Sequence, residues 1–147
     1  MLTVKDLLRM KGNEVWSISP DTSTLDAMRS LADKHVGAML VMEAGKVVGI
    51  ISERDFVYRV AEDSRLDLNT PIRDYMTTKV YIVAPETSIE ECMKTMTDRR
   101  IRHLPVFKGD TLVGLVSIGD VVKGIISEQT STIDSLENYI MGTGYGH

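Results

Sequence analysis

The hydrophobic positions of the chain follow a helical period in some stretches and form short unbroken runs in others, and this order of stretches occurs twice. Residues 25–32 and 89–96 carry apolar side chains every three or four positions, which is typical of amphipathic helices. Two apolar runs follow each stretch, AMLVM then VVGII in the first copy and LPVF then LVGLV in the second. Because turn residues separate the two runs, each pair predicts a β-hairpin.

Start signals precede the first helix of each copy. Ser23-x-x-Asp26 and Thr87-x-x-Glu90 have the composition of capping boxes, and each follows a proline. A second amphipathic helix is expected after each hairpin, with apolar side chains at positions 56, 57 and 60 or at positions 121, 122, 125 and 126. Each copy therefore predicts a β-α-β-β-α unit preceded by a lead-in segment, and the expected fold class is α+β.

The two copies are an internal duplication. Shifted by 65 residues, Val15–Val60 aligns with Val80–Ile125 without a gap, and 12 of the 46 aligned positions are identical, which indicates a repeat. A repeat of about 60 residues is marginal alone and leaves one face of its sheet uncovered. We therefore expect the two repeats to pack sheet to sheet with pseudo-twofold symmetry and to form two clefts between them. The expected boundaries are 4–62 for the first repeat, 63–71 for a polar linker, 72–128 for the second repeat and 129–147 for a helical tail.

The predicted tail continues the helical pattern beyond the second repeat. Its apolar positions are Ile133, Leu136, Tyr139 and Ile140. Because the core of the second repeat is already accounted for, this additional apolar stripe predicts docking against a partner subunit.

Composition narrows the classes of function. The chain is 43% hydrophobic and 26% charged with a formal net charge of −4, which is ordinary for a globular protein and disfavours nucleic-acid binding. The N-terminus lacks the apolar stretch of a signal peptide, and the longest wholly apolar run, Ala38–Met42, is far too short to cross a membrane. A cytoplasmic protein is expected. Cys92 is the single cysteine, so we expect a buried thiol rather than a disulfide or a zinc site.

The aspartates that close VVGIISERD and LVGLVSIGD are candidate ligand-binding residues. A strand is expected to end at Ser52 or Ser117 and a helix to begin there, so that Asp55 or Asp120 can complete a capping box. Capping alone explains the pattern. The location also favours a nucleoside, because helix N-termini attract phosphate and an adjacent aspartate can accept hydrogen bonds from both ribose hydroxyls. Spacing alone leaves both interpretations open.

The segment RRIRHLPV, residues 99–106, is a second candidate. Arg99 and Arg100 are expected to close a helix, where cations stabilise the helix dipole. Arg102 and His103 follow at the entrance of a strand, so that alternation turns one of them toward the cleft and the other away. A guanidinium near a helix N-terminus suits a phosphate group.

These features together resemble a known family, the CBS-domain pair or Bateman module. The resemblance rests on the duplication, the strands ending GIISERD and GLVSIGD, the RIRHLPV segment, and the spacing of these strands from Pro20 and Pro85. It covers residues 4–127. It implies that adenine nucleotides or related adenosyl compounds, such as AMP, ADP, ATP, NAD or S-adenosylmethionine, bind between the repeats, and that the protein forms a homodimer.

The resemblance also implies the residues of each cleft. One cleft would contain Gly12, Asn13, Val36, Gly37, Arg102, His103, Leu115, Ser117, Gly119 and Asp120. The other would contain Ile50, Ser52, Arg54, Asp55, Met76, Thr77, Thr78 and Ile101.

The two clefts are not expected to bind identically. Arg54 stands where the second copy has Gly119, so that its side chain either adds a phosphate contact or fills the space. Gly37 and Ala38 stand where the second copy has Arg102 and His103, which removes cationic groups from the Asp55 cleft. We therefore expect the Asp120 cleft to bind more tightly.

Other functions fit the sequence less well. The segment GTGYGH has the glycines of a phosphate loop, but no strand leads into it and a mobile terminus is expected. His35, His103 and His147 lack the spacing of a metal site, and no familiar catalytic motif occurs. We expect a regulatory module that senses an adenosyl ligand and signals to a partner protein, with no catalysis and no catalytic cofactor or metal. The alternative is a structural or protein-interaction module with unoccupied clefts.

Overall fold

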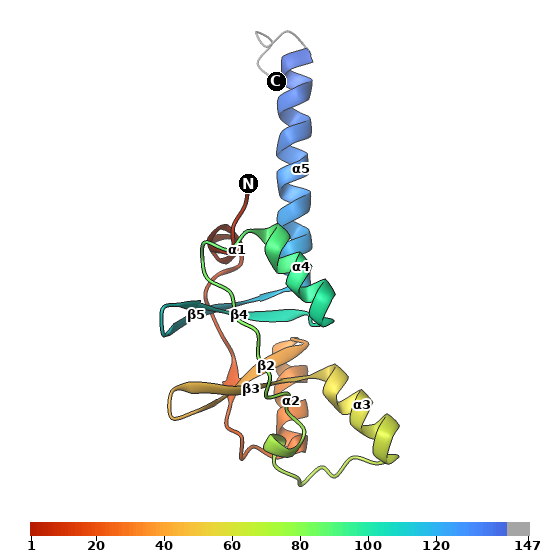
Figure 1. Cartoon of the computed structure of the whole chain (residues 1–147). Coiled ribbons are helices and arrows are strands. Elements are labelled where there is room, and N and C mark those ends of the chain that lie inside the picture. Colours follow the sequence, from red (N-terminus) through yellow and green to blue (C-terminus); the bar gives the residue numbers. More distant parts are fainter. Residues whose placement is uncertain (141–147) are drawn as a thin grey trace. The chain divides into compact units, whose positions relative to one another are not determined.

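The computed structural model describes residues 1–140, so the predictions for GTGYGH and His147 lie outside the described residues. The helices and strands, drawn in Figure 1, are α1 (Val4–Lys11), β1 (Ser17–Ile18), α2 (Thr24–Lys34), β2 (Ala38–Glu43), β3 (Lys46–Ser52), α3 (Glu53–Asp63), the 3-10 helix η1 (Ile72–Asp74), α4 (Ile89–Arg99), β4 (His103–Lys108), β5 (Thr111–Ser117) and α5 (Ile118–Ile140). Helices combined with two separate sheets confirm the α+β class.

The chain divides into two compact units with one sheet each. The repeat-1 unit is Glu14–Tyr81, and the repeat-2 unit is Met1–Asn13 together with Ile82–His147. The segment that precedes the first repeat therefore belongs to the unit built from the second. The packing of the two sheets against each other stays a prediction.

The sheet of the repeat-1 unit has the strand order β1-β2-β3. β1 runs parallel to β2, and β2 and β3 form the expected hairpin, in which Leu40 lies opposite Ile50. α2 begins after Ser23, whose hydroxyl accepts the backbone N–H of Asp26 at 3.1 Å, as a helix N-cap does. Buried apolar side chains from these elements form one core: Ala27, Leu31, Met39, Val41, Ile51, Phe56 and Ile72.

The lead-in of the second repeat completes the repeat-1 unit. Ile72 in η1 is fully buried, and its backbone N–H donates to the carbonyl of Thr22 at 2.8 Å. Further along, Ile50 and Thr77 exchange two backbone hydrogen bonds of 2.9 Å each, so the lead-in lies against β3. The chain thus leaves the repeat-1 unit only after Tyr81.

The repeat-2 unit is built in the same way from α1, α4, β4, β5 and α5. Val4 and Leu7 of α1 are buried, and the backbone N–H of Val4 donates to the carbonyl of Thr87 at 2.9 Å. α4 contributes Cys92 and Met96, both buried, which confirms the prediction of a buried thiol. α5 continues without a break from Ile118 to Ile140, so the expected tail is the second half of this helix as far as the described residues reach.

The expected first strand of the second repeat is reduced to a single bridge, between Val83 and Val106. In the repeat-1 unit, the backbone N–H of Leu40 donates to the carbonyl of Trp16 at 3.3 Å. Pro105 occupies the position equivalent to Leu40 and has no N–H, so the corresponding hydrogen bond to Tyr81 cannot form. The segment still lies parallel to β4, because the backbone N–H of Val83 donates to the carbonyl of Pro105 at 3.0 Å and the carbonyl of Val83 accepts the backbone N–H of Phe107 at 2.9 Å. The second repeat thus keeps the predicted order of elements with a shorter first strand.

One helix start also differs from its prediction. The N-cap of α4 is Ser88, whose hydroxyl accepts the backbone N–H of Glu91 at 3.1 Å. Thr87, the expected cap, instead accepts the backbone N–H of Ala84 at 3.1 Å. In the alignment of the two repeats, Ser88 lies opposite Ser23, the cap of α2. The alignment therefore identifies the N-cap of α4 correctly, whereas the local capping-box motif does not.

Candidate ligand-binding sites

The two strand-to-helix turns have the predicted capping geometry. In the first, one carboxylate oxygen of Asp55 accepts the backbone N–H of Ser52 at 2.8 Å and its hydroxyl at 3.1 Å. In the second, Asp120 accepts the backbone N–H of Ser117 at 2.8 Å, and the Ser117 hydroxyl accepts the backbone N–H of Asp120 at 3.2 Å. Both carboxylates are therefore fixed at a helix N-terminus, where unpaired N–H groups favour negative charge.

Asp120 is also paired with a lysine that the sequence interpretation missed. The ammonium group of Lys11 lies 2.6 Å from the Asp120 carboxylate and donates a second hydrogen bond, of 2.7 Å, to the carbonyl of Leu115. Burial opposes ionisation of Asp120, but Lys11 and the backbone of Ser117 outweigh it and hold the pKa of this carboxyl below its ordinary value. Asp120 is thus an ionised carboxylate that the protein's own hydrogen bonds hold in place, next to the cation of Lys11.

The pattern of α1 contains the signal that would have found Lys11. The buried face of this helix carries Val4, Leu7 and Leu8, and Lys11 is the next position on the same face. The helix packs against β5, so the end of its buried stripe meets the turn that begins α5. A lysine that ends an apolar stripe commonly lays its stem along the core and extends its charged group to the edge.

Two more basic side chains, those of His103 and Arg102, lie near Asp120. His103 begins β4 and faces Ser117 of β5 in the strand register, and it is half-buried, whereas Arg102 is exposed. Burial lowers the pKa of His103, and the charges of Lys11 and Arg102 lower it further, while Asp120 acts in the opposite direction. The repeat-2 unit thus gathers a carboxylate and three basic side chains at one turn. His103 is the more buried of this pair, and which of the two faces a cleft between the repeats stays a prediction.

The equivalent aspartate of the repeat-1 unit has a neutral partner. The hydroxyl of Thr77, in the lead-in segment, donates to Asp55 at 3.0 Å. The guanidinium of Arg54, the residue before Asp55, donates to the hydroxyl of Tyr58 at 2.5 Å and lies 5.4 Å from the centre of that ring. The two turns therefore share a backbone geometry, but Asp120 is paired with the ammonium group of Lys11 and Asp55 accepts a hydrogen bond from the hydroxyl of Thr77.

The repeated glycine of VVGII and LVGLV has a packing role. A Cβ atom at Gly49 would lie 2.7 Å from the sulfur of Met76 and 2.9 Å from the carbonyl oxygen of Thr77. At Gly114 it would lie 2.7 Å from a methyl carbon of Leu8. In both units a lead-in segment thus approaches the central residue of the last strand closely, and this approach brings Thr77 or Lys11 to the aspartate.

The remaining predicted residues divide between the units. Gly12 and Asn13, both exposed, follow Lys11 in the repeat-2 unit, and Gly119 is exposed in the first turn of α5. Met76 is half-buried and Thr78 is exposed, beside Thr77 in the repeat-1 unit. The other expected contributors lie in the unit opposite to their aspartate: Val36 and Gly37 for Asp120, and Ile101 for Asp55. Their part in a shared cleft stays a prediction.

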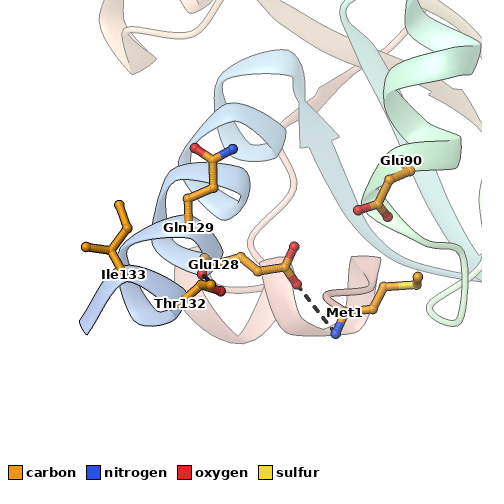
Figure 2. A pocket seen from close by; sticks show the side chains of 6 residues that line it. All are labelled: Met1, Glu90, Glu128, Gln129, Thr132 and Ile133. Carbon is orange, nitrogen blue, oxygen red and sulfur yellow. Dashed lines mark hydrogen bonds and ion pairs between the residues drawn. The ribbon is translucent and has the colours of Figure 1, made fainter. Parts of the chain in front are cut away.

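The described cavities lie elsewhere in the repeat-2 unit. A surface groove of about 590 Å³ runs beside α5 and is lined by Met1, Glu90, Glu128, Gln129, Thr132 and Ile133. Figure 2 shows Glu128 pointing to the N-terminal amine, 3.5 Å away, while Ile133 points away from it. None of these residues belongs to the predicted ligand sites. Within residues 1–140, no helix is long and apolar enough to cross a membrane.

Comparison with known proteins places these observations in a family. The family model of the CBS domain matches residues 4–62 and 72–127. The chain is 37% identical to the mitochondrial CBS domain-containing protein CBSX3 of Arabidopsis thaliana, over 97% of this chain and 73% of that protein. It is 39% identical to the CBS-domain containing protein ATU1752 of Agrobacterium tumefaciens, whose structure superposes with a TM-score of 0.80 over 84% of this chain and 98% of that one.

Two further solved structures contain adenosyl compounds. The CBS domain protein PAE2072 of Pyrobaculum aerophilum, solved with AMP, is 25% identical with a TM-score of 0.70, over 81% of this chain and 89% of that one. The CBS domain pair of protein MJ0100, solved with 5′-methylthioadenosine and S-adenosylmethionine, is 21% identical and shares the fold, with a TM-score of 0.75 over 87% of this chain and 98% of that one. With two matched repeats that span most of its length, this chain belongs to the CBS domain family.

Proposed function

We propose that this protein is a regulatory module that binds an adenosine-containing ligand, with no catalytic step of its own. The observation that carries the proposal is the arrangement at Asp120: a carboxylate held at a helix N-terminus, next to the amine of Lys11 and the ring of His103. A carboxylate suits a ribose diol, and the adjacent cations suit phosphate. The relative solved with AMP supports this class of ligand.

The different partners of the two aspartates support different ligands for the two turns within this class. At Asp120, Lys11 and Arg102 add positive charge, so a phosphorylated adenosine such as AMP, ADP, ATP or NAD fits there. At Asp55 the partner is the uncharged hydroxyl of Thr77, which favours an adenosyl compound with less negative charge. We place the tighter phosphate-dependent site at Asp120.

Lys11 links ligand binding to the lead-in segment. The ammonium group of Lys11 already donates a hydrogen bond to Asp120, so a ribose that binds the carboxylate must compete with Lys11. The phosphate of the same ligand would give Lys11 a new partner. Ligand binding then moves the end of α1, and a partner protein reads that change through linkage. A ligand present at a hundred times its dissociation constant would stabilise the binding-competent form by about 2.7 kcal/mol.

The experiment is isothermal titration calorimetry of the full chain with AMP and with adenosine. Asp120→Asn should weaken both ligands about tenfold or more, since a hydrogen bond to a charged group contributes about 1.5–3 kcal/mol. Lys11→Met should weaken AMP several-fold more than adenosine. Lys5→Met is the matched control, because Lys5 is an exposed lysine of the same helix and should leave both affinities unchanged.

Two results would overturn the proposal. One is the absence of binding for AMP, ADP, ATP, NAD and S-adenosylmethionine alike, together with no nucleotide in native mass spectra of the freshly purified protein. That result would favour the alternative, a structural or protein-interaction module in which the aspartates only cap helices. The other is equal weakening of AMP by Lys11→Met and Lys5→Met, which would remove Lys11 from the site. Cytoplasmic localisation and the identity of the regulated protein stay predictions.

A further inference from the structure

The second half of α5 is an exposed helix that extends beyond the rest of the repeat-2 unit (Figure 1). Every residue from 129 to 140 is exposed. This stretch is rich in serine and threonine, which are weaker helix formers than alanine, and isolated helices shorter than about 12–15 residues are marginal in water. Packing within residues 1–140 therefore contributes little to the stability of this half of α5, and its apolar side chains are available for a contact with another chain.

The exposed apolar residues of α5 form a heptad seam. Six positions follow each other at spacings of four, three, four, three and four residues, which is the a and d pattern of a coiled coil. Five of the six are aliphatic and remain between 44% and 77% exposed. They are Val122, Ile126, Gln129, Ile133, Leu136 and Ile140.

The seam is complementary to itself in the antiparallel direction. It is symmetric about Ser131, so a second α5 of opposite direction places Ile126 against the partner's Leu136 along a continuous apolar contact. Val122 would meet the partner's Ile140, and Gln129 would meet the partner's Ile133. No seam position is left without a partner.

The charges beside the seam select this direction. Lys123 and Glu137 lie on the same flank, immediately after Val122 and Leu136, and both are exposed. In the antiparallel pair, Lys123 lies beside the partner's Glu137, and the symmetry produces this contact twice. In a parallel pair the same two charges would be about 21 Å apart along the axis, since a helix rises about 1.5 Å per residue. We propose that α5 binds the α5 of a second copy of this chain as an antiparallel two-stranded coiled coil.

The surroundings of the seam leave room for a second helix. The groove beside α5 is lined by Gln129 and Ile133 from the seam and by Met1 and Glu90 across from them. Ile133 points away from the N-terminal residue in Figure 2, so the ion pair of Met1 with Glu128 does not cover the seam. The contact requires no ligand, so its test is independent of the proposed nucleotide site.

The first test is the mass of the full chain in solution by light scattering or sedimentation, without nucleotide. The wild-type protein should be a dimer, and Ile133→Glu, which puts a charge into the seam, should shift it to monomer at the same concentration. Asn138→Glu is the matched control, because it adds the same charge on the opposite side of the same exposed helix and should leave the dimer intact. Circular dichroism and melting of each variant establish that the unit is still folded.

The second test fixes the direction of the helices. Lys123→Glu and Glu137→Lys should each weaken the dimer several-fold, and the double variant should restore it. Under oxidising conditions, a mixture of Ile126→Cys and Leu136→Cys chains should form a disulfide-linked heterodimer, whereas either variant alone should not. The native thiol does not interfere, because Cys92 is buried.

The outcomes divide clearly. A monomeric wild-type chain, or a dimer that Ile133→Glu leaves as stable as Asn138→Glu does, would overturn the inferred interface. Efficient cross-linking of the Leu136→Cys variant with itself would show a parallel pair and overturn the antiparallel assignment. Rescue by the double charge variant together with mixed cross-linking supports it.

Discussion

Substitution of alanine for Gly49 tests how closely a lead-in segment must approach its sheet. The new Cβ would lie 2.7 Å from the Met76 sulfur and 2.9 Å from the Thr77 carbonyl oxygen. The sulfur can move with its side chain. The carbonyl cannot, because the backbone of Thr77 is held by two hydrogen bonds of 2.9 Å to Ile50. The lead-in must therefore shift away from β3.

The size of the effect follows from the nature of the contact. Overpacking of a closed core costs about 1–3 kcal/mol. For a chain of this length each kcal/mol lowers the melting temperature by about 2–4 °C, so Gly49→Ala should lower it by about 2–12 °C. The shift also withdraws the hydroxyl of Thr77 from Asp55, so a ligand at that turn should lose affinity in the same variant.

Two glycines provide the comparison. At Gly114 the obstacle is the flexible end of Leu8, so Gly114→Ala should cost less than Gly49→Ala. At Gly119, in the first turn of α5, a Cβ would lie 3.6 Å from the Ser117 hydroxyl, which is an ordinary contact, and alanine should stabilise the helix by about 0.5 kcal/mol. Thermal and urea unfolding of the three variants measures the order. Equal stability of Gly49→Ala and the wild-type chain would refute the close approach of the lead-in.

Three further predictions concern single side chains. Because the pKa of His103 is held below its ordinary value near 6.5, mainly by burial, the folded state is more stable above that pH and loses stability as the pH falls through it. His103→Gln should flatten this loss between pH 7.5 and 5.5 in urea titrations, and an unchanged slope would exclude His103 as its source. Burial raises the pKa of Cys92 to about 11, so a thiol reagent at pH 8 should label it only on unfolding, and rapid labelling of the native protein would contradict its placement. Ser88→Ala should cost about 1 kcal/mol of stability in urea unfolding as the loss of an N-cap, and more than Thr87→Ala; the reverse order would restore Thr87 as the cap.

Local features of the fold could be predicted from the sequence because their causes are local. The hairpins and the capping boxes at Ser52 and Ser117 depend on residues within a few positions of one another. The shortening of the first strand of the second repeat to a single bridge is consistent with Pro105, which has no N–H where Leu40 of the first repeat donates one.

The candidate site was only half predictable for a different reason. Asp120 and Ser117 were found because they share a short motif, whereas Lys11 is 109 positions from Asp120. A contact of that separation depends on how α1 packs on β5, which no local pattern states. The partners that distinguish the two aspartates, Lys11 and Thr77, both come from lead-in segments. They could therefore be identified only from the packing of those segments in the structure.

The assignment of each lead-in to the opposite repeat has a consequence for how the chain folds during synthesis. α1 leaves the ribosome about a hundred residues before β5, the strand against which it packs, is complete. At a synthesis rate of about 5–20 residues per second, Val4 and Leu7 wait about 5–20 s for their core. During that time they are exposed apolar groups on a nascent chain. A cut between the repeats would place each lead-in segment on a different piece from the sheet that it covers. The apolar side chains of both lead-ins would then remain exposed.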